Sequence, residues 1–190
     1  MKSILLALGI LFSGLSHATL IQLDTERSDY KIGETIVVTL SVSDFTETLS
    51  GFWAEIFYSS SAISLLDWHF GEGFDDGFGS SPFADHDASS GALYLEEYAD
   101  FFADESILAG LQGSSFVLAT FSFLATETGN ILLSFNPEKF GALNFANDFI
   151  DVNTADLNFT VSAVEVPVPT TALLMFAGMA LLLRRKQLNK

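Results

Sequence analysis

The sequence between Thr35 and Ser43 reads TIVVTLSVS, and its alternation of residue types decides the fold class. Every second position from Ile36 to Val42 is aliphatic, and the positions between are mainly Thr or Ser. Side chains two apart lie on the same side of a β-strand, so this period of two predicts a strand with one buried face.

Seven further segments combine β-branched or aromatic residues with flanking Gly, Asp, Asn or Ser clusters, which is typical of strands joined by turns. These segments are residues 19–23, 52–58, 63–70, 92–98, 116–124, 131–135 and 157–162. No long helical periodicity competes: residues 103–111 favour one helical turn at most, and residues 140–149 are either a loop or a short strand. The pattern predicts an all-β protein, an antiparallel β-sandwich of the jelly-roll type.

The first 18 residues have the organisation of a secretory signal peptide. A basic start at Lys2 precedes an apolar stretch, residues 4–15, and the small-x-small site Ser16-His17-Ala18. We expect export through the Sec translocon and cleavage by signal peptidase between Ala18 and Thr19. The alternative is a buried N-terminal helix.

The last 25 residues combine a proline motif, an apolar run and a basic end. Their order is Val166-Pro167-Val168-Pro169, then residues 170–183 without a charge, then Arg184-Arg185-Lys186. This arrangement resembles the C-terminal sorting signal of PEP-CTERM proteins, which are substrates of exosortase in Gram-negative bacteria. The resemblance covers residues 166–190 and implies a transient anchor in the inner membrane, followed by release to the cell surface or the extracellular space.

A plain C-terminal membrane anchor is the alternative interpretation of this tail. As a short C-terminal helix, residues 170–183 would span roughly 21 Å, against about 30 Å of bilayer hydrocarbon, so the span is short for a stable transmembrane helix. One position departs from the family, because Val168 stands where a glutamate usually separates the two prolines. The departure leaves open which sorting-enzyme subtype reads the tail.

The region between the two ends is near 150 residues, has no cysteine and is strongly acidic. All 24 Asp and Glu residues lie there against Arg27, Lys31 and Lys139, which gives a net charge of −21. Without disulfides the domain has to be held by its core, for which this length suffices. Such a charge repels nucleic acid and anionic lipid, so we exclude a nucleic-acid partner and expect cations or basic partners.

Three stretches together resemble the opening of a cohesin-type domain. They are YKIGETIVV at residues 30–38, LSGFWAEIFY at 49–58 and ISLL at 63–66. LATFSF at residues 118–123 and TGN at 128–130 are similar to the second half of that family. The resemblance implies a cohesin-like β-sandwich over residues 19–165. It departs where Tyr58 is followed by three serines, a place where the family usually has Asp-Pro.

An acidic, glycine-rich stretch is the candidate metal site. Residues 71–79 read GEGFDDGFG and residues 83–87 read FADHD, so Asp75, Asp76, Asp85 and Asp87 are candidate Ca²⁺ ligands. Ca²⁺ takes six to eight oxygens, yet the spacing matches no EF-hand loop. The alternative is a solvated, mobile surface loop. Zinc is disfavoured because His86 would point away from its two aspartate neighbours in an extended chain.

Catalysis has little support, and we assign no catalytic residue. There is no thiol nucleophile, no Gly-x-Ser-x-Gly elbow and no His-Glu-x-x-His motif. The aromatic residues Trp53, Trp68 and Tyr94 are candidates for a sugar-stacking platform, although aromatic residues on strands more often belong to the core.

The sequence therefore predicts an exported, non-enzymatic surface or extracellular-matrix protein. Its cohesin-like domain would bind a surface protein, and an exosortase-type enzyme would process its tail. A carbohydrate-binding module associated with exopolysaccharide is the first alternative, and a hydrolase is the second.

Overall fold

The computed structural model describes residues 18–164. The predicted signal-peptide body and the sorting tail, including Val166, Pro167, Val168, Pro169, Arg184 and Arg185, lie outside the described residues. Between residues 18 and 164, no helix has both the length and the apolar character needed to cross a bilayer.

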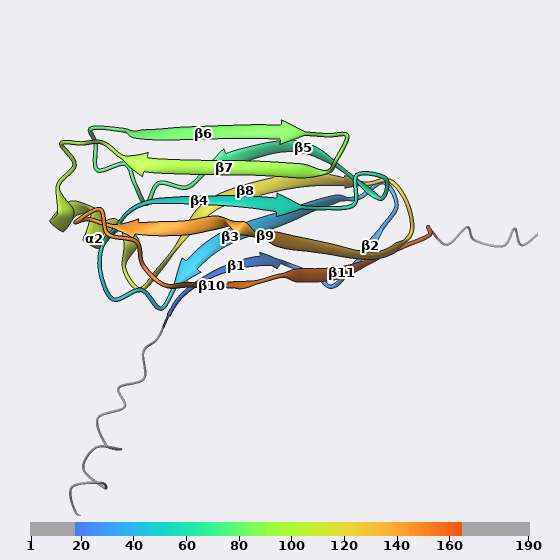
Figure 1. Ribbon diagram of the computed structural model, residues 1–190. Coiled ribbons are helices and arrows are strands. Elements are labelled where there is room, and N and C mark those ends of the chain that lie inside the picture. Colours follow the sequence, from blue (N-terminus) through green and yellow to red (C-terminus); the bar gives the residue numbers. More distant parts are fainter. Residues whose placement is uncertain (1–17, 165–190) are drawn as a thin grey trace, which may run out of the picture.

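Two β-sheets lie face to face, with a short helix at one end of the sandwich (Figure 1). The five-stranded sheet has the order β10-β1-β3-β8-β5, and the six-stranded sheet has the order β2-β11-β9-β4-β7-β6. The elements are β1 (Thr19–Thr25), β2 (Asp29–Lys31), β3 (Thr35–Ser43), β4 (Leu49–Phe57), β5 (Ile63–Phe70), β6 (Ser80–Asp87), β7 (Ala92–Ala99), α2 (Glu105–Gln112), β8 (Ser115–Ala125), β9 (Gly129–Asn144), β10 (Val152–Ala155) and β11 (Leu157–Ser162).

Strand pairing is antiparallel except at two places near the sheet edges. β10 pairs with β1 in parallel, and β2 pairs with β11 in parallel. The predicted all-β sandwich is confirmed.

The core lies between the two sheets and follows the alternation seen in the sequence. In β3, Ile36, Val38, Leu40 and Val42 are fully buried. Strand β4 contributes Phe52 from the opposite sheet, which is also fully buried. Burying each such side chain stabilises the fold by roughly 1.5–3 kcal/mol, so the core can hold the domain without disulfides.

Helix α2 is longer than the single turn that we expected from the sequence. Asp104 caps its N-terminus by accepting hydrogen bonds from the backbone N–H groups of Ser106 and Ile107. At its other end the buried Gln112 amide holds the start of β4 and the loop between β5 and β6. Its Oε1 accepts from Leu49 N at 2.9 Å, and its Nε2 donates to Leu49 O at 2.8 Å and to Gly73 O at 3.0 Å. The helix is thereby fixed to the start of β4.

Residues 80–87 form a strand, β6, where the sequence suggested part of an acidic loop. The strand pairs only with β7, so it is the edge of the six-stranded sheet. An edge strand tolerates Pro82 and exposed polar side chains, and such a strand lacks the alternation of a half-buried one. The same reason explains the two short strands that the sequence did not indicate, β2 and β10, which also lie at sheet edges.

Candidate functional site

The outer surface of the six-stranded sheet carries alternating aromatic and acidic side chains. In β4, Phe52, Ala54 and Ile56 point into the core, which leaves Trp53 and Glu55 on the outer side. The same alternation in the neighbouring strands places Tyr94 and Glu96 of β7, and Phe83 and Asp85 of β6, on that side.

Strand register arranges these six side chains in two rows across the sheet. One row is Glu55, Tyr94 and Asp85, because Tyr94 is the Cα partner of both acidic residues. The adjacent row is Trp53, Glu96 and Phe83, with Glu96 in the middle. Each ring therefore has at least one carboxylate as a cross-strand neighbour. We call the surface formed by Trp53, Glu55, Phe83, Asp85, Tyr94 and Glu96 the acidic–aromatic face.

Two of the three rings, those of Phe83 and Tyr94, are held in place by contacts within the face. Phe83 and Tyr94 meet edge to face, with 6.4 Å between ring centroids. The Tyr94 hydroxyl donates to Glu96 Oε2 at 2.6 Å. Burial of the phenol and this hydrogen bond both raise the pKa of Tyr94, so the hydroxyl stays protonated at neutral pH.

A bulge in β9 hollows the face beside Glu55. The register of β9 against β4 shifts between Ala54 and Ile56, and residues 136–139 of β9 loop out at this point. Lys139 Nζ donates to Glu55 Oε1 at 2.7 Å, and Asn136 Nδ2 donates to Glu55 Oε2. These two hydrogen bonds lower the pKa of Glu55 and keep the carboxylate ionised, and the one from Lys139 has the larger effect.

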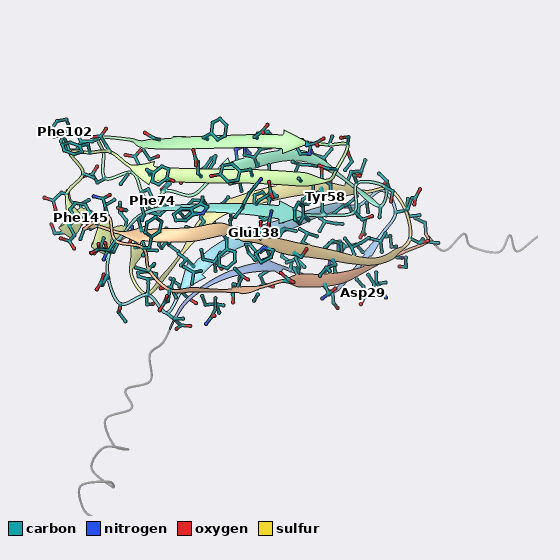
Figure 2. The ribbon with its side chains drawn as sticks, viewed as in Figure 1. Asp29, Tyr58, Phe74, Phe102, Glu138 and Phe145 are labelled. Atoms are coloured by element: carbon teal, nitrogen blue, oxygen red, sulfur yellow. The ribbon has the colours of Figure 1, made fainter. Side chains whose placement is uncertain are left out.

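The resulting concavity has a volume of about 450 Å³ and opens to solvent. Glu138, labelled in Figure 2 on β9, is one of its lining residues. Its walls are three aromatic residues, three acidic residues and one lysine: Trp53, Phe83, Tyr94, Glu55, Asp85, Glu138 and Lys139.

Two of the three predicted ligand-binding aromatic residues are brought together. Trp53 and Tyr94 both line the concavity. Trp68 is not part of it, because it lies on β5 in the other sheet, half-buried against the core and 6.3 Å from the His86 ring. The predicted three-residue platform is therefore reduced to two members.

The four candidate Ca²⁺ ligands are not gathered at one place. Asp75 and Asp76 lie in the loop before β6, where their carboxylates accept backbone N–H groups of Gly77, Phe78, Gly79 and Asp104. Asp85 and Asp87 lie near the far end of β6, roughly 20 Å along the strand at about 3.3 Å per residue. In the part of the chain that the structure describes, no three His, Asp or Glu side chains form a group able to hold a metal.

Asp87 has a structural role instead. Its carboxylate accepts hydrogen bonds from the hydroxyls of Ser89 and Ser90 and from their backbone N–H groups, closing the turn between β6 and β7. These hydrogen bonds lower the pKa of Asp87 to about 2, and the one from the Ser89 hydroxyl has the largest effect.

Both histidines of the sandwich have a side-chain partner: that of His86 lies outside its own strand, and that of His69 lies on the same strand. His86 Nε2 lies 2.6 Å from the hydroxyl of Tyr58, the residue after β4, although β7 lies between β4 and β6 in the sheet. His69 Nε2 lies 3.0 Å from Asp67 on the exposed side of β5. Neither histidine lines the concavity.

Sequence reasoning missed Glu55, Phe83, Glu138 and Lys139 as members of the site. Pro137 was the signal for the bulge, because proline within a central strand is confined to irregularities of the ladder. The cross-strand position of Phe83 had no comparable signal, because it depends on the pairing of β6 with β7.

Solved structures are the known proteins that this chain resembles. No protein-family model matches the chain, and a search of curated proteins finds no match. Solved structures do match. A type II cohesin domain from the cellulosome of Acetivibrio cellulolyticus has a TM-score of 0.65 at 13% identity, covering 76% of this chain and 95% of that chain.

Two further structures extend this likeness. A type I cohesin–dockerin complex from Clostridium thermocellum has a TM-score of 0.61 at 14% identity, covering 80% of this chain and 98% of that chain. A non-cellulosomal cohesin from the hyperthermophilic archaeon Archaeoglobus fulgidus has a TM-score of 0.58 at 12% identity, covering 76% and 91%. The described domain therefore has a cohesin-like fold, and at these identities the likeness concerns the fold alone.

Proposed function

We propose that this protein is a non-enzymatic protein-binding module, displayed at the cell surface or in the extracellular matrix, which binds its partner on the acidic–aromatic face. The observation that carries the proposal is the alternation of outward-facing rings and carboxylates around a concavity of about 450 Å³. Aromatic residues are enriched among the side chains that dominate protein–protein binding.

The fold supports a binding role over a catalytic one. The Clostridium thermocellum structure is a cohesin–dockerin complex, so a domain of this fold binds another protein there. Two of the other similar structures are also complexes: one of CaDoc0917 with CaCohA2, and one of a type II cohesin with X-dockerin.

Charge defines the chemistry of the expected partner. Residues 19–168 carry 24 acidic and three basic residues, and Lys139, on the rim of the face, is already paired with Glu55. A field of this sign accelerates the approach of a basic protein surface and disfavours an acidic one.

The two chain ends supply the delivery step of this proposal. Strand β1 begins at Thr19, so cleavage after Ala18 would remove the signal peptide without shortening the strand. Residues 166–190 would then hold the protein at the inner membrane until an exosortase-type enzyme acts. The intact mass of the native protein tests this step: loss of both residues 1–18 and the basic tail supports sorting, whereas a retained tail in the membrane fraction indicates a plain anchor.

A photo-crosslinking experiment in the producing cells tests the binding face. A benzoylphenylalanine residue at Tyr94 samples the face, and the same residue at Val117 samples the outer surface of the five-stranded sheet, where Val117 is 41% exposed. We expect a discrete adduct with a basic protein from position 94 alone. Adducts from position 117 alone, or equally from both, would contradict the proposed face.

Carbohydrate binding is the second candidate, because Trp53 and Tyr94 line one concavity together with polar side chains. Binding to the producer's own exopolysaccharide that is lost in Trp53→Ala and retained in Trp68→Phe would favour it. Absence of binding to that polysaccharide, together with a protein adduct at position 94, would exclude it.

A further inference from the structure

The concavity of the acidic–aromatic face has the chemistry of a receptor for one cationic side chain. This step rests on the proposed function and names the group that the partner inserts. We infer that the concavity binds an arginine side chain of the partner, with its guanidinium against the rings of Trp53 and Tyr94 and its N–H groups directed to Asp85 and Glu138.

Lys139 already shows that this surface accommodates a cation. Its ammonium lies 2.7 Å from Glu55 Oε1, and the Glu55 side chain is only 11% exposed. The pair is contributed by the bulge of β9 and the outer side of β4, so it forms one wall of the concavity. Glu55 is thus satisfied within the domain.

The other two carboxylates of the concavity remain free. Among residues 18–164, the ion pairs are Arg27–Glu34, His69–Asp67 and Lys139–Glu55, and none involves Asp85 or Glu138. Both acidic residues are exposed, and Asp85 is the cross-strand partner of Tyr94. Two negative charges beside aromatic rings attract a cation by charge and by the ring quadrupole together.

Guanidinium fits this arrangement better than ammonium does. It is planar, stacks on aromatic faces and presents its donors as a fork that matches carboxylates, whereas ammonium is a compact and strongly hydrated charge. A neutral sugar would stack on the rings and donate hydroxyls to the two carboxylates, but it carries no charge to pair with theirs. The charges therefore favour an arginine-bearing protein partner over a glycan.

Indole NMR signals give a direct measurement on the full-length chain. The protein contains two tryptophans, so ¹⁵N-labelling of tryptophan gives two indole N–H signals, and Trp68→Phe assigns them. The probes are the peptides acetyl-Gly-Arg-Gly-amide and acetyl-Gly-citrulline-Gly-amide, which differ in charge and hardly in shape. We expect the arginine peptide to shift the Trp53 signal, to leave that of Trp68 in place, and to lose its effect at high salt.

Three variants test the roles of the charges. Asp85→Asn should lower the affinity for the arginine peptide about two- to fivefold, because the substitution removes one exposed ion pair. Lys139→Gln should strengthen binding to a similar extent by removing a like charge. Glu127→Gln is the matched control, because it changes the net charge by the same amount as Asp85→Asn in an exposed position outside the concavity.

The proposal is overturned if the citrulline peptide shifts Trp53 as strongly as the arginine peptide, if no shift occurs at saturating peptide, or if Asp85→Asn behaves like Glu127→Gln. These failures are separable from failure of the proposed function. If an adduct forms at position 94 but the arginine peptide does not shift the Trp53 signal, the arginine site is excluded and the proposed binding face still stands. If adducts form at position 117 alone, the proposed binding face is excluded, regardless of the result with the peptides.

Discussion

The indole of Trp53 lies against Gly141 on the neighbouring strand, so closely that a Cβ atom on the glycine would come within 2.2 Å of the ring. The two residues are Cα partners across β4 and β9. A second pair repeats this relationship on the same face, because a Cβ on Gly51 would come within 2.3 Å of the Tyr98 ring. Glycine on one strand therefore lets an aromatic ring of the next strand lie flat on the sheet.

Gly141→Ala should displace the Trp53 ring from the sheet. The added methyl group cannot share the space of the indole, and overpacking of this kind costs about 1–3 kcal/mol. We expect a lower free energy of unfolding in urea and a weaker response of Trp53 to the arginine peptide.

Gly110→Ala is the control for this substitution. Gly110 lies in α2 with open space around it, so alanine there should raise stability by up to about 1 kcal/mol through helix propensity. An unchanged Trp53 indole signal in Gly141→Ala would show that the ring does not depend on the glycine.

Glu97 is expected to make the domain less stable as the pH rises. It is 2% exposed on the core side of β7, its Oε1 accepts from the Ser80 hydroxyl at 2.6 Å, and its Oε2 has no partner among the described residues. Burial of the carboxyl group raises the pKa of Glu97 from 4.5 to about 7. The hydrogen bond from Ser80 acts in the opposite direction, and the nearby charge of Asp75 adds a smaller increase.

Since the folded state binds the proton more tightly than the unfolded state, the contribution of Glu97 to stability is fully present below pH 4.5 and is lost between pH 4.5 and about 7. The loss is on the order of 3 kcal/mol. Urea unfolding at a series of pH values, compared with Glu97→Gln, isolates this contribution from the general charge repulsion. If the difference between the two proteins does not change with pH, Glu97 does not titrate in this way.

Gln112→Ala should destabilise the α2 end of the sandwich. It removes the three hydrogen bonds that tie the helix to Leu49 and Gly73 and leaves their buried backbone groups without partners. We expect a loss of roughly 2–4 kcal/mol, measured by urea unfolding. The adjacent Leu111 is 47% exposed, and Leu111→Ala should have a much smaller effect. Equal effects would mean that the amide adds nothing beyond packing.

Calcium is expected to act on this domain through general charge alone. Asp75 and Asp76 already accept backbone N–H groups, and Asp85 and Asp87 lie near the other end of β6. We expect Ca²⁺ and Mg²⁺ at equal millimolar concentrations to raise the melting temperature equally, by screening the charge of −21. A shift specific to Ca²⁺ that Asp75→Asn or Asp87→Asn abolishes would restore the calcium site suggested by the sequence.

The sequence predicted most of the central strands and the edge strand β5, but it missed the edge strands β2, β6 and β10. The alternation from Thr35 to Ser43 and the aromatic strand around Trp53 report burial on one face, which is a local property. Strand β6 has no such pattern, because an edge strand buries little and carries proline and charges. Its assignment to a loop also misplaced Asp85 and Asp87, which the sequence grouped with Asp75.

The sequence by itself determined an all-β sandwich, its core positions and its acidic charge, because each follows from composition or from the period of two along a strand. Tertiary structure decided which side chains share the concavity. Trp53 and Tyr94 are 41 positions apart, and they line one concavity only because β4 pairs with β7 in one register. Trp68 is nearer to Trp53 in the chain and yet lies in the opposite sheet. Local stereochemistry sets the side of a strand on which a residue points, whereas non-local pairing decides what it meets there.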